Sequence, residues 1–195
     1  MAEDEFRDLF QSERAAAEKR FPFIARFRDK VNIAPTKTAN KGGQGEFVEA
    51  DSPDNPMPGK PTITIGVNSH KLSGGVTDTI INDMVHAAGQ LSPDYRKLRK
   101  EVVSNLSEDA LSLAKRRYQK DFKGKFSGSN FSTFDNFLNR YWADGIVQHL
   151  LLPENSEINQ TMQSSPKAVP ALNAIKRLFE TGVAPGKRIG DVLNE

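Results

Sequence analysis

Residues 79–88, which read Thr-Ile-Ile-Asn-Asp-Met-Val-His-Ala-Ala, carry the strongest structural signal of the chain. At about 100° per residue their apolar side chains gather on one face of a helix. Asn82 and His86 then lie together on a flank, and Asp83 lies on the other side. The pattern predicts a helix that packs on one face and lines a cleft with the other. The packing face consists of Ile80, Ile81, Met84, Val85 and Ala88.

Residues on either side set the expected ends of this helix. Thr77 or Asp78 can cap its start, because either side-chain oxygen can accept a hydrogen bond from a free backbone N–H. Gly89 is placed to end it in a left-handed turn. Ser92 and Pro93 then predict the cap and first position of a following helix.

The composition indicates a soluble chain with one core. Of the 195 residues, 37% are hydrophobic and 27% are charged, which allows one well-buried domain and is short for two. No apolar run approaches the roughly 18 residues that cross a bilayer, and the acidic start is unlike a secretory signal. The absence of cysteine excludes disulfides, thiolate metal sites and a cysteine nucleophile.

The pattern of elements predicts a predominantly helical α+β fold with a small sheet. Strands are expected at residues 46–50 and 62–66, the second being Thr-Ile-Thr-Ile-Gly. Helices are expected at residues 3–20, 107–122, 133–152 and 170–180, besides the two described above. The predicted division is an N-terminal helical arm and mobile loop over residues 1–45, an α+β domain over 46–180 and a loose tail over 181–195.

This order of elements resembles a minimal zincin-type metallopeptidase domain over residues 60–155. In zincins an edge strand borders the cleft, and a helix with the motif His-Glu-x-x-His places two imidazoles on one zinc ion. By position, Asn82 stands at the first ligand, Asp83 at the general base, His86 at the second ligand and Asp144 at the third. The resemblance therefore implies a frame from which most of the catalytic groups are missing, similar to degenerate domains of bacteriophage and prophage virion proteins.

Each of these residues also has a structural interpretation. His86 is either a surviving zinc ligand or a polar residue at the edge of a packed helix. Asp144 is either a remnant of the ligand set or a structural acid, and a hydrogen bond between Asp144 and His86 would suit both accounts. Asn82 is a poor zinc donor compared with imidazole, and Asp83 is one methylene shorter than the usual base. His149 fits a core position, and His70 fits an exposed loop.

A basic stretch follows the central helix. Residues 94–125 contain ten Lys or Arg against five Asp or Glu, whereas residues 126–165 contain one Arg against four acids. Such charges are most simply the solvated faces of amphipathic helices, with contact to phosphate as the alternative. No sequence-reading motif accompanies them. The candidate phosphate contacts are Arg96, Lys97, Arg99, Lys100, Lys115, Arg116 and Arg117.

The preferred interpretation is a non-catalytic structural or protein-interaction module, a pseudoenzyme without a cofactor, in a phage or prophage particle. Its expected partners are other phage structural proteins or a second copy of itself, in the virion or the host cytoplasm. One alternative is a weak zinc-dependent hydrolase that uses His86 and Asp144 as ligands and Asp83 as the base. A second alternative is nonspecific contact with nucleic acid through the basic helices.

Overall fold

The computed structural model describes residues 3–36, 46–53, 55, 57–66, 75–121, 133–152, 163–188 and 190. The chain forms two compact units. Unit 1 comprises residues 1–91, 179–183 and 189–195, and unit 2 comprises residues 92–178 and 184–188. The domain division expected from the sequence, with boundaries after residues 45 and 180, stays a prediction beside this grouping.

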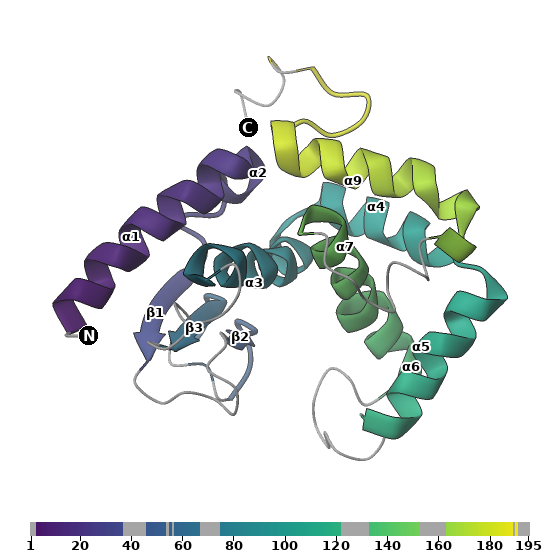
Figure 1. Ribbon diagram of the computed structural model, residues 1–195, viewed down its shortest axis with the longest axis horizontal. Coiled ribbons are helices and arrows are strands. Elements are labelled where there is room, and N and C mark those ends of the chain that lie inside the picture. Colours follow the sequence, from purple (N-terminus) through teal and green to yellow (C-terminus); the bar gives the residue numbers. More distant parts are fainter. Residues whose placement is uncertain are drawn as a thin grey trace. The chain divides into compact units, whose positions relative to one another are not determined.

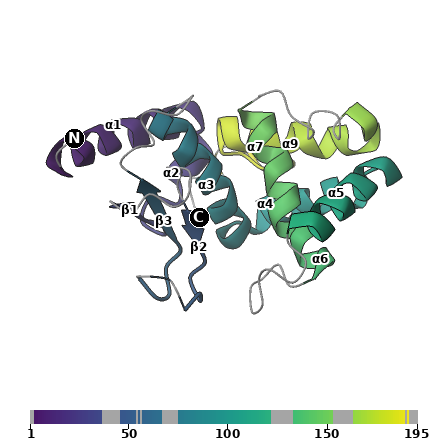
Figure 2. The same cartoon turned by 60° about the horizontal axis from the view of Figure 1, so that its bottom comes forward.

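Unit 1 combines helices with a small sheet. Helix α1 (Glu3–Arg20) is followed by the short α2 (Pro22–Ala25) and later by α3 (Gly75–Leu91). Figures 1 and 2 show α3 beside the three strands, with α1 packed along α3. Helix α1 forms where the sequence predicts it, and it buries Phe10 and Ala17 of its thin apolar stripe.

The sheet has three strands in the order β1-β3-β2. β3 (Thr62–Gly66) lies in the centre, pairs with β1 (Asn32–Thr36) in parallel and with β2 (Glu46–Val48) in antiparallel fashion, and buries Ile63 and Ile65 completely. β2 and β3 confirm the predicted strands, although β2 ends two residues early. β1 was not predicted, because its proline suits only an edge strand and weakens the strand pattern.

Helix α3 is longer at both ends than the sequence analysis predicts. It begins at Gly75, so Thr77 and Asp78 lie inside its first turn instead of capping it. Gly89 is also helical and buried, and the helix runs on to Leu91. The prediction that Gly89 ends the helix is therefore wrong. The predicted apolar face is confirmed: Ile80, Ile81, Met84, Val85 and Ala88 are all buried.

Unit 2 is helical in its described part. Ser92 caps its first helix as predicted, with its Oγ accepting a hydrogen bond from the backbone N–H of Tyr95 at 3.1 Å. In chain order the elements are α4 (Pro93–Ser104), α5 (Glu108–Asp121), α6 (Phe134–Asn136), the π-helix η2 (Phe137–Trp142), α7 (Ala143–Leu151), the 3-10 helix η3 (Pro166–Ala168) and α9 (Val169–Thr181), whose last three residues belong to unit 1.

The α-helical spacing of residues 133–152 predicts one core-facing set, and the π-helix changes that packing; the set is Phe134, Phe137, Leu138, Tyr141 and Trp142. A π-helix turns less per residue than an α-helix, so a side chain assigned to the core by α-helical spacing can point outward. Phe137 and Trp142 are buried, but Tyr141 is 40% exposed. The prediction that Tyr141 faces the core is therefore wrong.

The fold class expected from the sequence is confirmed, because the described chain is predominantly helical with a small mixed sheet. No described helix is both long enough and apolar enough to cross a membrane.

Candidate functional site

The central helix of unit 1 carries the candidate site against the edge of the sheet. Asn82, Asp83 and His86 are all half-buried on α3. The imidazole of His86 stacks on the ring of Phe47 from β2, with ring centroids 5.9 Å apart and planes inclined by 25°. This contact holds the ring of His86 against an edge strand of the sheet.

Asp83 is the most perturbed titratable group of the site. Its Oδ2 atom is buried and has no hydrogen-bond partner among the described residues. Burial raises the pKa of Asp83 to about 7; the charge of His86 opposes this rise and that of Glu46 adds to it. Asp83 and His86 are three residues apart on α3, and this spacing places their side chains on neighbouring sides of the helix. The prediction that Asp83 lies on the other side of the helix is therefore wrong.

The chemistry that such a carboxyl can perform is proton transfer at neutral pH. A general acid or base works best when its pKa lies near the working pH, and Asp83 meets that condition. A catalytic zinc ion needs three protein ligands and an open position for water. Within the described residues no group of three His, Cys, Asp or Glu side chains is placed to hold a metal ion.

Asp144, the predicted third ligand, belongs to a buried hydrogen-bond network in unit 2. Its Oδ1 atom accepts hydrogen bonds from the Tyr95 hydroxyl at 2.6 Å and from Nη1 of Arg99 at 2.8 Å. Tyr95 is completely buried, and Asp144 and Arg99 are 2% and 9% exposed. The carboxylate therefore has a structural role in joining α7 to α4. His86 is in the other unit, and its pairing with Asp144 stays a prediction.

Electrostatic interactions stabilise this network. Burial raises the pKa of Tyr95 well above its ordinary value, and the charge of Asp144 adds to that effect, so the hydroxyl remains a donor. Burial lowers the pKa of Arg99, but the charge of Asp144 and the other interactions with Asp144 and Tyr95 together outweigh this effect, so the net change in pKa is upward. Arg99 also lies over the Tyr95 ring, with Cζ 5.4 Å from the centroid. Substituting either partner of a buried, hydrogen-bonded ion pair strongly destabilises the fold, because the other charge is left buried and unpaired.

Of the other predicted site residues, Arg99 belongs to the Asp144 network. His149 is half-buried on α7, and His70 lies outside the described residues. The prediction that Arg99 contacts phosphate is wrong, because its side chain is buried and paired with Asp144. Arg117 pairs with Asp121 at 2.7 Å. The remaining members are exposed: Arg96, Lys97, Lys100, Lys115 and Arg116.

Sequence reasoning missed the partners of both groups. Glu46 and Phe47 stood in a predicted strand, but no local signal pairs that strand with α3. The hydrogen bond from Tyr95 to Asp144 was not predicted, because the two residues are 49 positions apart in the chain. Comparison of the chain with protein-family models, with curated proteins and with solved structures found no match.

Proposed function

We propose that the chain is a non-catalytic structural or protein-interaction module built on a degenerate metallopeptidase frame, and that it serves in a phage or prophage particle. The observation that carries the proposal is the use of Asp144. A carboxylate that accepts hydrogen bonds from both Tyr95 and Arg99 is committed to the packing of its own unit. It is a poor metal ligand there, since the guanidinium already neutralises its charge.

The residues of α3 support the same proposal. Asn82 supplies a neutral amide where a zinc peptidase needs an imidazole, and Asp83 is one methylene shorter than the Glu that usually serves as the base. His86 alone matches the motif, and it is stacked on Phe47. These residues do not fit a catalytic zinc ion. The phage assignment is supported by the sequence resemblance.

Metal analysis of the full chain tests the loss of catalysis. We expect protein purified without a chelator to contain well below one zinc per chain, and the His86→Ala variant to contain the same amount. An exposed-residue variant, Asp51→Asn, serves as the purification control. Stoichiometric zinc that disappears only in the His86→Ala variant would overturn the proposal.

A weak zinc-dependent hydrolase is the second candidate, and the pKa of Asp83 near 7 is the observation that favours it. That group could accept a proton from water if a metal were held beside it. The test is cleavage of a denatured protein substrate at pH 8 by the native chain and by Asp83→Asn. Zinc-dependent cleavage abolished by the substitution would support a hydrolase, and equal background rates would exclude this role of Asp83.

A further inference from the structure

The loop that joins β2 to β3 is held in place by one buried side chain. Asn55 is 6% exposed, and its Nδ2 atom donates hydrogen bonds to the backbone carbonyls of residues 49, 50 and 60. Its Oδ1 atom accepts hydrogen bonds from the hydroxyl of Thr62 at 2.8 Å and from the backbone N–H of Met57 at 3.0 Å. The described residues of this loop are therefore bound to the start of β3 and to one another.

Met57 is exposed on this ordered loop. It is 44% exposed, and its backbone is held on both sides. Its N–H donates to Asn55, and its carbonyl accepts a hydrogen bond from the N–H of Lys60 at 3.2 Å. A side chain on a backbone that is already ordered loses less conformational entropy on binding than one on a free loop. Met57 is therefore a preorganised apolar contact on unit 1.

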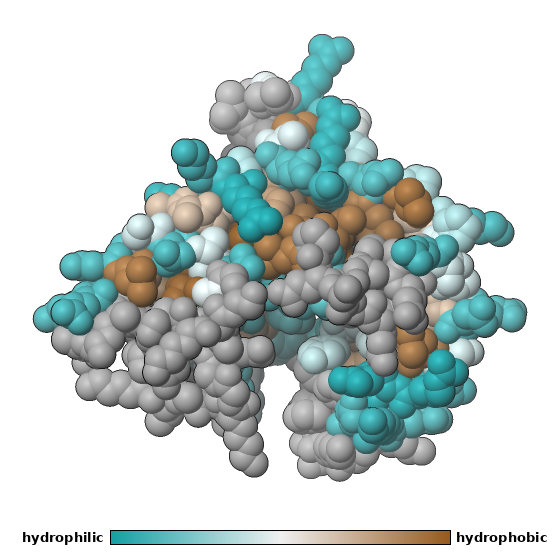
Figure 3. All heavy atoms as spheres, viewed as in Figure 1, coloured by the Kyte–Doolittle hydropathy of each residue, from teal (hydrophilic) through white to brown (hydrophobic). Residues whose placement is uncertain are grey.

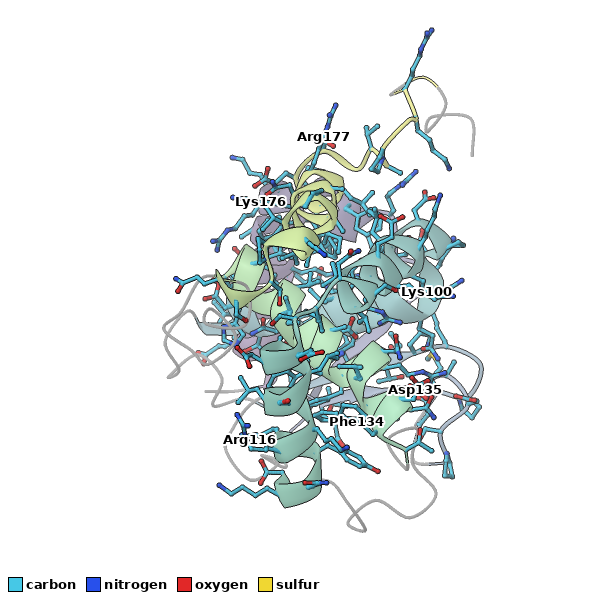
Figure 4. The ribbon with its side chains drawn as sticks, turned by 90° about the vertical axis from the view of Figure 1, so that its right-hand side faces the viewer. Lys100, Arg116, Phe134, Asp135, Lys176 and Arg177 are labelled. Atoms are coloured by element: carbon cyan, nitrogen blue, oxygen red, sulfur yellow. The ribbon has the colours of Figure 1, made fainter. Side chains whose placement is uncertain are left out.

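Tyr141 is the corresponding feature of unit 2. It is 40% exposed on η2, and its ring stacks on the buried Phe137, with ring centroids 5.6 Å apart and planes inclined by 25°. Phe137 in turn contacts Phe134 and Tyr118, with centroids 6.4 Å and 5.3 Å away. Phe134, labelled in Figure 4, begins this aromatic row. The row supports the Tyr141 ring from one side and leaves part of it in solvent.

Formal charge divides unequally between the two units. Unit 2 contains sixteen Lys or Arg against nine Asp or Glu, a net charge of +7, whereas unit 1 contains eleven against sixteen, a net charge of −5. Figure 3 shows hydrophilic side chains gathered over α5. Figure 4 shows bases of unit 2 on α4, α5 and α9: Lys100, Arg116, Lys176 and Arg177. Unit 1 of one copy and unit 2 of another therefore attract each other, whereas like units repel.

We propose that copies of the chain associate through Met57 of one copy and Tyr141 of the next. A methionine thioether makes favourable contacts with aromatic rings, and Met and Tyr are both enriched at the centre of protein interfaces. The opposite net charges of the two units orient the encounter. This inference rests on the proposed function, because it names a partner and a contact for an interaction module.

A second copy fits these features better than nucleic acid does. Phosphates would complement the bases of unit 2, but they would leave Met57 of the acidic unit 1 without a role. A second copy supplies an apolar contact for both exposed side chains and a complement for both net charges. Each copy carries one Met57 and one Tyr141, so the contact can close a two-fold pair or continue along a row of copies.

The test is sedimentation velocity of the full chain over a range of concentrations. Two anchoring side chains make a small interface, so we expect the mean mass to rise over roughly 10 µM to 1 mM protein. Raising the salt from about 0.1 M to about 1 M shortens the Debye length about threefold and should weaken the association. A chain that stays monomeric up to about 1 mM would overturn the proposal.

Substitution of Met57 separates the apolar contact from the charge. Met57→Glu makes unit 1 more acidic, so an association through charge alone would become tighter. We expect it to become at least about tenfold weaker, because a carboxylate is costly to bury against the Tyr141 ring. Val169→Glu is the matched control, since Val169 of α9 is 41% exposed, and it should change the association less than about threefold. Equal losses in the two variants would refute the role of Met57.

Tyr141 variants test the other half of the contact. Tyr141→Ala should weaken the association at least about tenfold, whereas Tyr141→Phe keeps the ring and should stay within about threefold of the native chain. Met57→Glu retains an intact Tyr141, and Tyr141→Ala retains an intact Met57. An equimolar mixture of these two variants should therefore form heterodimers, although each variant alone associates weakly. A mixture no heavier than its separate components would overturn the pairing of the two residues.

The remaining outcomes distinguish this inference from its rivals. A chain that is monomeric alone and gains mass only with an oligothymidine would assign the charge of unit 2 to phosphate and contradict the proposal. Zinc content is measured separately. A monomeric chain without zinc would overturn the association alone, whereas an associating chain with stoichiometric zinc that His86→Ala removes would overturn the non-catalytic assignment and leave the contact standing.

Discussion

Replacing Asp83 by Asn tests whether the carboxyl of the central helix is held protonated by burial. In the folded chain its pKa is raised from 3.8 to about 7. The folded protein therefore keeps this proton over a pH range in which the unfolded chain has released it. The contribution of Asp83 to the free energy of unfolding consequently falls as the pH rises from about 4 to about 7. Above pH 7 this penalty, the free energy lost by ionising the buried carboxyl, is fully present. Asn cannot ionise, so the variant escapes this penalty.

The magnitude follows from the same pKa. Between pH 5 and pH 8.5 the penalty for the native carboxyl grows by roughly 2–3 kcal/mol, about 1.4 kcal/mol for each pH unit up to pH 7. The free energy of unfolding of Asp83→Asn should rise by that amount relative to the native chain. The difference between the free energies of unfolding of the two proteins at each pH cancels the titration of distant groups. What remains is the contribution of Asp83 and its interactions with His86 and Glu46.

Urea unfolding at pH 5 and pH 8.5, followed by circular dichroism, is the assay. Asp51→Asn makes the same chemical change at an exposed turn of the same unit and should shift the free energy by less than about 0.5 kcal/mol at both pH values. A difference between Asp83→Asn and the native chain that does not change with pH would refute the argument from burial.

Four further substitutions test the packing. Tyr95→Phe removes a 2.6 Å hydrogen bond to a charged acceptor and should cost about 1.5–3 kcal/mol in urea unfolding. Arg99→Met leaves the carboxylate of Asp144 buried without its cation and should cost about 3–5 kcal/mol by the same measurement; a cost below 1 kcal/mol would mean that the pair is not held as described. Ser92→Ala removes the cap of α4 and should lower the thermal unfolding midpoint, at a cost of about 1 kcal/mol. Asn55→Ala removes the side-chain hydrogen bonds to the backbone carbonyls of residues 49, 50 and 60, so it should speed proteolysis of the loop before β3 and cost roughly 2 kcal/mol.

Local signals predicted much of the fold. The Ser92 and Pro93 pair marks the start of α4, and the β-branched run at Thr62–Gly66 marks β3, because capping and strand propensity act within a few residues. β1 escaped prediction because it is stabilised by parallel pairing with β3, about 30 residues away, and not by its own sequence. Gly89 was wrongly predicted to end α3, because the low helix propensity of glycine is a local signal and packing keeps Gly89 helical.

The site was predictable only in part. The i, i+4 spacing predicted that Asn82 and His86 share a flank of α3, but Asp83 was predicted to lie on the other side. The two contacts that determine their surroundings are long-range. His86 meets Phe47 across the sheet edge, and Asp144 meets Arg99 across 45 residues of chain, so neither could be derived from spacing.

The most direct measurement on the central claim is zinc titration of the double variant Asn82→His with Asp83→Glu, followed by calorimetry. If α3 keeps the geometry of a zinc-peptidase helix, the second imidazole should meet His86 on one face and create zinc affinity that the native chain lacks. Adding His86→Ala to the double variant should remove the gain. Zinc binding by the double variant no tighter than that of the native chain, with its helical content intact, would contradict the degenerate metallopeptidase frame.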